Sequence, residues 1–207
     1  MSFLAAYIYD RVMADTEAAC LKQWRQELLS TVAGNVLEIG AGTGANIPFY
    51  NIETVNLTLC EPDPIMRKQL KQKLADTHLL NIIVSNDGAE DINAPDHSMD
   101  CVVSTLVCCS VKDLGISLQE IKRVLKPGGR FIFLEHVAAE IGTGRSRWQN
   151  ILNPVWRKIA GNCHLNRDTQ QAIIDAGFKL ELIKNESMRK AIPIIRPTIR
   201  GVAISPG

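Results

Sequence analysis

A short apolar stretch that runs directly into a cluster of glycines is the feature that most limits what this chain can fold into. Residues 36–39 read Val-Leu-Glu-Ile, and Gly40-Ala41-Gly42-Thr43-Gly44 follow at once. Glycine lacks a β-carbon, so three glycines within five residues let the backbone turn tightly and approach a ligand closely. A buried strand that ends in such a loop and then opens a helix is typical of an α/β domain that binds a nucleotide-like cofactor.

The following hundred residues alternate between apolar strand patterns and amphipathic helix patterns. Strands are expected at 36–39, 54–60, 81–85, 100–105 and 130–134, with helices after the glycine loop, at 65–74 and at 115–125 and a turn at 126–129. Such alternation requires parallel pairing through right-handed crossovers, which gives a doubly wound sheet. The ligand then lies at the carboxyl ends of the strands.

The C-terminal region follows a different pattern. A helix is expected from about residue 168 to Ala176, where Gly177 stops it, and strands are expected at 180–185 and 200–204. Two strands without an intervening helix favour an antiparallel hairpin at the edge of the sheet. The fold predicted is therefore α/β, with a doubly wound, mostly parallel, seven-stranded sheet and a C-terminal antiparallel hairpin.

The chain is short enough for one domain over residues 1–207. We expect four parts, which are an N-terminal helical cap (1–33, with an amphipathic helix at 14–32), a cofactor-binding core (34–137), an inserted segment (138–165) and a C-terminal helix with two strands (166–207). The inserted segment carries Trp148, Trp156 and several arginines at the ligand-bearing edge. It is interpreted as a lid or a wall of the substrate site.

Charge and hydropathy narrow the class of partner. The net charge is +1, without the basic excess that nucleic-acid binding favours, so a small-molecule ligand is expected and no nucleic acid. No stretch approaches the ~18 apolar residues that span a membrane, and no signal peptide is recognisable. The apolar run 3–9 is expected to be a capping helix or a weak peripheral membrane contact.

The cysteines point to a reducing compartment. Six are scattered through the chain, mostly in apolar runs, with no C-x-x-C pair and no cluster of cysteine and histidine at zinc-binding spacing. Buried, reduced thiols in a cytoplasmic protein are expected, and no metal site.

Two cofactors are compatible with the glycine loop alone. With Ala45 the loop also satisfies G-x-G-x-x-A, the dinucleotide fingerprint, so an NAD-dependent oxidoreductase must be considered. Glu61 ends the second expected strand, where a carboxylate accepts the hydroxyls of an adenosine ribose in either case. Glu38 favours S-adenosylmethionine, because an acid before the glycines suits a cationic amino-acid end better than a pyrophosphate.

The ordered set of motifs resembles a known family. V-L-E-I-G-A-G-T-G, E-P-D, D-G-A-E, D-C-V-V-S-T-L and L-K-P-G-G occur in the order seen in class I S-adenosylmethionine methyltransferases, which have a Rossmann-like fold. The stretches T-L-V-C-C-S-V, R-F-I-F-L-E-H-V-A-A-E and G-N-C-H-L-N-R-D-T resemble the animal methyltransferase-like thiol S-methyltransferases. Those enzymes carry an N-terminal membrane anchor, and we expect this chain to lack one.

The resemblance implies a role for particular residues. Glu38 and the three glycines would hold the methionine end, and Glu61 the ribose. Pro62 or Asp63 would flank the adenine, and Gly88 and Ala89 would edge it, with Glu90 as a further candidate. Thr105 and Leu106 would lie beneath the sulfonium. The residues implied to bind the cofactor are Glu38, Gly40, Gly42, Gly44, Glu61, Pro62, Gly88, Ala89, Thr105 and Leu106.

Methyl transfer is an in-line displacement in which the protein orients the nucleophile and excludes water. A thiol acceptor needs little help from a base, whereas a hydroxyl or carbon acceptor needs more. His136 is the candidate for that base, with a hydrogen-bonded loop histidine as the alternative. Cys108 and Cys109 are interpreted as core residues, because direct transfer needs no enzyme nucleophile.

The function predicted is methyl transfer from S-adenosylmethionine to a small molecule, preferably a thiol, with S-adenosylhomocysteine as the second product. C- or O-methylation of a quinone or lipid-like acceptor is the alternative within the class. A protein that binds the cofactor without turnover also stays open, since core motifs establish binding better than catalysis.

Overall fold

Seven strands form one sheet in the order β3-β2-β1-β4-β5-β7-β6. The computed structural model describes the backbone of residues 3–75 and 82–206, and the side chains from residue 10 onward within these ranges. The strands are β1 (Gly34–Ile39), β2 (Val55–Cys60), β3 (Ile82–Ser85), β4 (Met99–Thr105), β5 (Leu125–His136), β6 (Lys179–Ser187) and β7 (Pro197–Ile204).

The pairing confirms the predicted fold class. The five strands from β3 to β5 pair in parallel, β1 lies between β2 and β4, and β7 is antiparallel to both β5 and β6. The order changes direction between β1 and β4, so their carboxyl ends form the switch point at which such sheets bind ligands.

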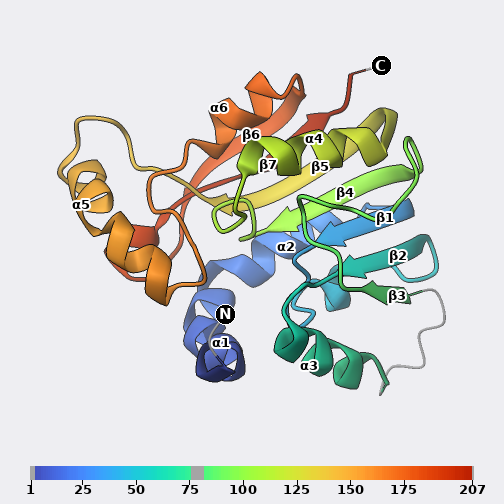
Figure 1. Cartoon of the computed structure of the whole chain (residues 1–207), viewed down its shortest axis with the longest axis horizontal. Helices are drawn as coiled ribbons and strands as arrows, with labels where there is room; N and C mark the ends of the chain where they lie inside the picture. Colours follow the sequence, from blue (N-terminus) through green and yellow to red (C-terminus); the bar gives the residue numbers. More distant parts are fainter. Residues whose placement is uncertain (1–2, 76–81, 207) are drawn as a thin grey trace.

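Helices cover both faces of the sheet. They are α1 (Phe3–Thr16), α2 (Lys22–Leu29), α3 (Pro64–Ala75), α4 (Leu114–Val124), α5 (Gly144–Ile159) and α6 (Thr169–Asp175). Figure 1 shows α4 and α6 on one side of the sheet, α3 on the other, and α5 beyond the carboxyl ends of the strands.

Side chains that alternate along the strands build two apolar cores. On one face, Val36 and Val103 pack with Leu28 of α2 and Leu70 of α3. On the other face, alternate residues of the same strands pack with α4 and α6, and they include Leu37, Val102, Leu118, Ile121 and Ile173. Strands buried on both faces carry nearly continuous apolar runs, which is why these segments were recognisable in the sequence.

Two expected elements differ from the structure. The glycine loop opens no α-helix, because residues 42–46 form turns and only a 3-10 helix follows, η2 (Ile47–Phe49). Pro48 lies inside that helix and lacks the N–H that a longer helix would need. Residues 126–129 form a bulge within β5 instead of a separate turn, since the pairing passes from Met99–Leu125 to Cys101–Arg130. Asn81, the expected start of the third strand, lies outside the described residues.

The N-terminal helices follow one another without a loop between them. A π-helix, η1 (Glu17–Leu21), connects α1 to α2. Leu21 and Trp24 are buried against the first core. Within residues 3–75 and 82–206, no helix is both long and apolar enough to cross a membrane.

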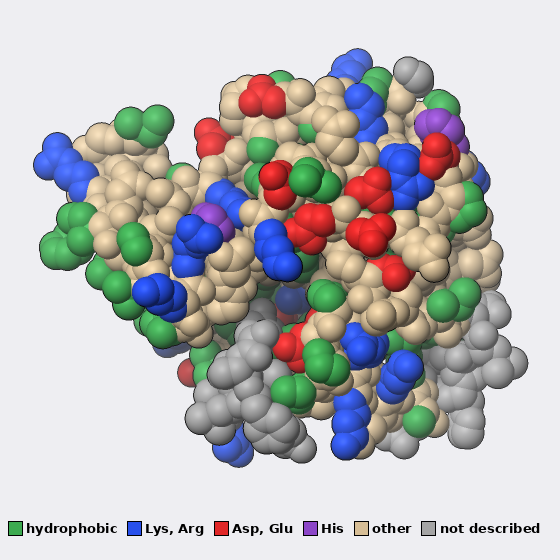
Figure 2. Space-filling view, in the orientation of Figure 1, with side chains coloured by type: hydrophobic (Ala, Val, Ile, Leu, Met, Phe, Trp, Pro, Cys, Tyr) green, Lys and Arg blue, Asp and Glu red, His purple; other side chains and the backbone are tan. Residues whose placement is uncertain are grey.

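Charged side chains of opposite sign gather over different elements. On the face in Figure 2, Lys and Arg side chains lie over α3, whereas Asp and Glu side chains lie over the segment between β3 and β4. The helix carries Arg67, Lys68, Lys71 and Lys73, and the segment carries Asp87, Glu90, Asp91 and Asp96.

Gly201 of β7 offers a direct test of the packing between β5 and β6. A β-carbon at this position would lie 2.1 Å from the carbonyl oxygen of Leu182 and 2.9 Å from Cζ of Phe133. We expect Gly201→Ala to lower the free energy of unfolding by about 1–3 kcal/mol, because the neighbouring backbone must move. Denaturant unfolding measures this change.

Gly144→Ala is the matched control. It lies in the first turn of α5, and nothing lies within 4 Å of a β-carbon added there. Because alanine favours a helix more than glycine does, the control should be as stable as the parent or slightly more so. Equal destabilisation of both variants would contradict a close packing of Gly201 between β5 and β6.

Candidate functional site

A cavity of about 540 Å³ opens at the carboxyl ends of β1, β2, β4 and β5. Figure 2 shows this face hollowed near its centre, where the strand ends of Figure 1 face α5. Residues of α1, the glycine loop, α5 and the 188–195 segment complete its wall. The cavity therefore lies where the sequence placed the ligand.

The three glycines have different tasks. A β-carbon on Gly40, whose φ is +57°, would meet Val107 at 2.5 Å, so this glycine allows the loop after β4 to pack against β1. A β-carbon on Gly44, whose φ is +82°, would collide with Ile47 and Leu70, so this glycine allows those side chains to pack there. Gly44 does not line the cavity. Gly42, with φ of +58°, lines the cavity with only a backbone oxygen 4.0 Å from its β-carbon position. At Gly42 the bare backbone faces open space.

Glu38 is buried at the end of β1 and lines the cavity. The Tyr50 hydroxyl donates a hydrogen bond of 2.7 Å to one carboxylate oxygen, and the Asn46 amide donates one of 3.0 Å to the other. Burial raises the pKa of Glu38 to about 7, although these hydrogen bonds and the nearby Arg25 act in the opposite direction. At neutral pH the Glu38 carboxyl is thus close to the midpoint of its titration.

Arg25 connects the N-terminal helices to this acid. Its guanidinium is buried and donates to Asn46, to Thr105 Oγ1 at 3.0 Å and to Glu17 at 2.8 Å. Glu17 is the first residue of the π-helix, and Arg25 lies in α2, directly after that helix. A buried charge needs such partners, so this network holds the helices against β1 and β4.

Glu61 connects the ends of β1 and β2. One carboxylate oxygen accepts the backbone N–H of Gly42 at 2.7 Å, and the other accepts that of Asp63 at 2.8 Å. Burial raises the pKa of Glu61 in spite of these hydrogen bonds. The carboxylate is therefore positioned by backbone groups on both sides, and it lines the cavity.

The end of β4 is shaped by a strained residue. Leu106 has a φ of +61°, a region that costs a non-glycine residue about 1–2 kcal/mol. Its N–H donates to the carbonyl oxygen of Leu134 at 2.8 Å. Buried Glu135 accepts the N–H of Val107 at 3.2 Å and the hydroxyl of Ser104. These bonds turn the chain so that Thr105, Leu106 and Val107 all face the cavity.

Several expected site residues lie away from the cavity lining. Pro62 is exposed, Gly88 forms an isolated bridge with Asp91, and Ala89 is buried in the second apolar core. The expected residues that line the cavity are Glu38, Gly40, Gly42, Glu61, Thr105, Leu106 and His136.

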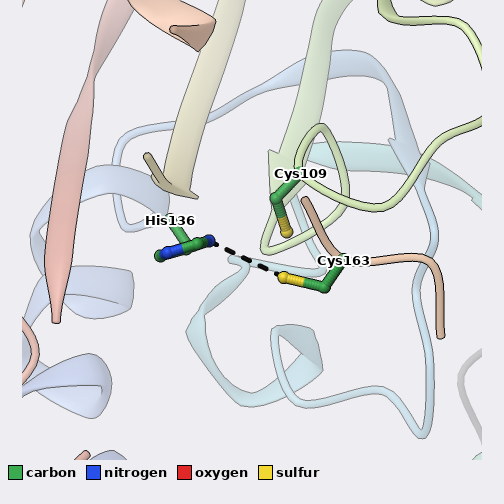
Figure 3. Close-up of side chains that lie close together, drawn as sticks. All are labelled: Cys109, His136 and Cys163. Atoms are coloured by element: carbon green, nitrogen blue, oxygen red, sulfur yellow. Dashed lines mark hydrogen bonds between the residues drawn. The ribbon is translucent and has the colours of Figure 1, made fainter. Parts of the chain in front are cut away.

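His136 ends β5 and meets two thiols at the far side of the cavity. The His136, Cys109 and Cys163 side chains point toward one another from three different segments (Figure 3). Nδ1 of His136 lies 3.7 Å from Sγ of Cys163. Hydrogen bonding by Cys109 and His136 lowers the pKa of the Cys163 thiol, and the same pairing with Cys163 raises that of Cys109.

The segment that carries Cys163 is fixed to the loop after β4. Arg167 donates to the carbonyl oxygens of Cys108 at 2.6 Å and Val111 at 2.7 Å, and the N–H of His164 donates to Cys109 at 2.7 Å. Trp156 and Ile159 of α5, which precede Cys163 in the chain, also line the cavity. Residues of 138–165 therefore form one of the cavity walls.

Sequence reasoning missed Arg25, Asn46 and Tyr50. Arg25 lies on the buried side of an amphipathic helix, where an arginine is unusual unless it is paired. That misfit in the helix pattern was the available signal. No local pattern distinguishes Asn46 or Tyr50, because their partner Glu38 belongs to another element.

A family model described as "Methyltransferase domain" matches residues 37–133. Among solved structures, the geranyl diphosphate C-methyltransferase of Streptomyces coelicolor A3(2) superimposes with a TM-score of 0.74 at 14% identity, covering 96% of this chain and 84% of that one. The [4+2]-cyclase SpnF has a TM-score of 0.73 at 17% identity, over 90% and 80% of the two chains. The family model and the fold are those of a class I S-adenosylmethionine-dependent methyltransferase.

Curated relatives narrow the class further. Thiol S-methyltransferase TMT1A of Homo sapiens is 34% identical over 199 residues, which cover 95% of this chain and 81% of the relative. TMT1B of Rattus norvegicus is 38% identical over 82% of this chain and 70% of its own length. The ubiquinone/menaquinone biosynthesis C-methyltransferase UbiE of Rickettsia rickettsii is 29% identical over 67% of this chain and 62% of its own length. The chain belongs to the methyltransferase family represented by the TMT1 proteins.

Glu38 gives the protein a testable dependence on pH. An acid whose pKa rises from 4.5 to about 7 on folding makes the folded state bind more protons between these values. Its contribution to stability is present below pH 4.5 and is lost as pH rises through about 7. Glutamine does not titrate. As pH rises, the free energy of unfolding of Glu38→Gln should therefore fall by up to about 3 kcal/mol less than that of the parent.

Denaturant unfolding of both proteins at pH 5 and pH 8 measures the difference, and other titrating groups cancel between them. A carboxyl titration of Glu38 followed by NMR gives an independent value. Identical pH slopes together with a midpoint near 4.5 would contradict the burial described here.

Proposed function

We propose that the chain transfers a methyl group from S-adenosylmethionine to the sulfur of a small, apolar thiol. The observation that carries the proposal is one continuous cavity with two unlike ends. Glu38, Gly42 and Glu61 line one end, and mainly apolar side chains of α5 and the 188–195 segment line the other. Membership in the family of the TMT1 thiol S-methyltransferases supports a thiol as acceptor.

The residues at the first end fit the cofactor. S-adenosylmethionine supplies a methyl group already activated on a sulfonium. Glu38 is an acid that can face its cationic amino-acid end, and Glu61 presents carboxylate oxygens to ribose hydroxyls. Gly42 leaves space that any side chain would occupy. We propose that Thr105 and Leu106 lie next to the reacting centre, and that Gly40 and Gly44 act through loop packing.

The second end suits an apolar acceptor. Met188, Ile192 and Ile195 line it together with Trp156 and Ile159 of α5. Apolar walls exclude water and orient the acceptor, which are the contributions that an in-line displacement needs from the protein. We therefore propose that 138–165 is the substrate wall of a single domain, with 1–33 as cap, 34–137 as cofactor core and 166–207 completing the sheet.

We also propose a reducing compartment, the cytoplasm, as the place of action. All six thiols are free, and Cys163 alone among them is not fully buried. Free thiols persist in a reducing environment, whereas small proteins of oxidising compartments commonly pair them.

Cofactor binding tests the roles of the two ends separately. Glu61→Ala should weaken binding of S-adenosylhomocysteine by about 10- to 100-fold, since a charged hydrogen-bond acceptor is lost. His136→Ala should change it far less, because His136 lies at the acceptor end. Titration calorimetry measures both, with Glu53→Ala, an exposed glutamate, as the control. Equal losses in the first two variants would show that the ends are assigned wrongly.

The acceptor is tested by incubating the protein with methyl-labelled S-adenosylmethionine and matched alkyl thiols, phenols and quinols. We expect label in thioethers, together with S-adenosylhomocysteine. Methylation of quinols alone would favour the activity named for UbiE, and cofactor binding without any turnover would favour a non-catalytic protein.

A variant of the apolar wall links the assay to the cavity. Ile159→Gln should raise the KM for the thiol several-fold and leave the Kd of S-adenosylhomocysteine unchanged, because a polar side chain weakens only the acceptor end. A raised Kd with an unchanged KM would oppose this arrangement.

A further inference from the structure

Three potential metal ligands meet at the acceptor end of the cavity. Cys109 comes from the loop after β4, His136 from the end of β5 and Cys163 from the segment after α5 (Figure 3). One ligand atom from each lies within 4.8 Å of the other two. Cys109 and His136 are buried, and Cys163 is half-buried.

His136 lacks the hydrogen bonds that a buried imidazole needs. Its Nε2 is buried with no partner among the described residues, and Nδ1 has only the Cys163 sulfur at 3.7 Å. By contrast, the ring of His97 meets the carbonyl oxygen of Leu125 at 3.0 Å. Buried polar groups without partners are rare in folded proteins and call for an unseen water, ion or ligand, and Nε2 of His164 beside the cluster is another such atom. Nδ1 of His136, which faces Cys163 and has only this long contact to sulfur, is the nitrogen that an ion in the cluster would take.

The spacing of the three atoms fits zinc. Zinc bonds of about 2.3 Å to sulfur and about 2.0 Å to nitrogen, at tetrahedral angles, place S and N about 3.5 Å apart and two sulfurs about 3.8 Å apart. The Sγ–Nδ1 distance is 3.7 Å, and all three atoms lie within 4.8 Å of one another. Small side-chain movements would bring all three onto one ion.

The surroundings hold the ligands in place from outside. The N–H of His164 and the guanidinium of Arg167 bind carbonyl oxygens of the 108–111 loop, and the Asn162 amide binds those of Ser110 and Val111. Glu135, beside His136, holds the start of the same loop. These contacts fix the backbone of the loop that carries Cys109 against the segment that carries Cys163, so the two thiols keep their positions beside the imidazole.

The cluster has three members among the described residues, and all three line the cavity. Two cysteines and one histidine with a fourth, open position form the ligand set of catalytic zinc, whereas structural zinc is closed by four protein ligands. We propose that Cys109, His136 and Cys163 bind a zinc ion whose open position takes the sulfur of the methyl acceptor. The acceptor part of this proposal rests on the proposed function, but the metal part does not.

Zinc would help to deprotonate the acceptor thiol before methyl transfer. A free thiol is mostly protonated at neutral pH, whereas a thiol bound to zinc is deprotonated. On binding, the S–H bond breaks, a zinc–sulfur bond forms and the proton passes to water. The sulfur then forms its bond to the methyl carbon with a lone pair. The electrons of the breaking methyl–sulfonium bond remain on S-adenosylhomocysteine, and the neutral thioether leaves the zinc as a weak ligand.

The soft ion also explains how acceptors would be distinguished. Zinc in a site with two thiolates favours a further soft sulfur ligand over a neutral phenol or alcohol. The zinc would therefore select a thiol from molecules of similar shape in the same apolar wall.

The first experiment measures metal without turnover. Untagged full-length protein, purified without chelators and dialysed against metal-free buffer, should retain about one zinc ion per chain by mass spectrometry of the metal content. Cys109→Ser, Cys163→Ser and His136→Asn should each weaken zinc binding more than ~10-fold, the loss that even outer partners of zinc ligands cause. Cys108→Ala is the matched control, because this neighbouring thiol is buried in the second core and is not one of the three clustered ligands.

The second experiment replaces zinc by Co²⁺, whose absorption reports its ligands. The Co²⁺ protein should show sulfur-to-cobalt charge transfer and the strong bands of tetrahedral cobalt. Adding 2-mercaptoethanol should change these bands, whereas ethylene glycol should not. The Cys109→Ser and Cys163→Ser variants should each lose part of the charge-transfer intensity.

The outcomes separate the proposals. Absence of bound zinc together with absence of a Co²⁺ spectrum, or a Cys109–Cys163 disulfide in the protein kept under reducing conditions, would overturn the metal site. Cobalt bands that ignore the thiol, or full thiol methylation by the zinc-free protein, would overturn its role with the acceptor. A thiol response in the Co²⁺ protein without any methyl transfer would support the site and reject the proposed function.

Discussion

The Glu38 carboxyl lies buried at the end of β1, and the rest of the site is arranged around the cost of holding an acid there. Tyr50 and Asn46 satisfy its two oxygens, and Arg25 brings a positive charge from α2. Arg25 in turn needs Glu17 and Thr105, so the same network joins the N-terminal helices to β1 and β4. Because buried polar groups must be paired, the need to satisfy Glu38 helps to fix the position of the N-terminal helices on the sheet.

This arrangement divides the cavity into two regions with different chemistry. Acids and bare backbone gather at β1 and β2, where the family's cofactor has its charged and hydroxyl groups. Apolar side chains from α5 and from 188–195 gather opposite. The proposed transfer from a sulfonium donor to an apolar acceptor suits this contrast, since such a reaction needs orientation and exclusion of water more than acid or base catalysis.

The cysteine and histidine side chains line the same cavity, in the part that we propose takes the acceptor. Cys109 follows β4, His136 is the last residue of β5 and Cys163 follows α5. Parallel strands bring their carboxyl ends together, so residues far apart in the chain meet there. The hydrogen bonds between 162–167 and 108–111 then place the two thiols beside the imidazole.

The amino-acid sequence by itself determined the order of strands and helices, the antiparallel C-terminal pair and the position of the glycine loop, because apolar periodicity and glycine placement are local properties. It also indicated Glu38, Glu61 and Thr105, which lie within the last two residues of a strand or directly after one. Only the tertiary structure decided that η2 replaces a helix, that Gly88 and Ala89 lie away from the cavity, and that Arg25 reaches Asn46. Cys109, His136 and Cys163 are spaced 27 residues apart and match no metal motif, so their meeting depends on packing between distant segments and could not be read from local patterns.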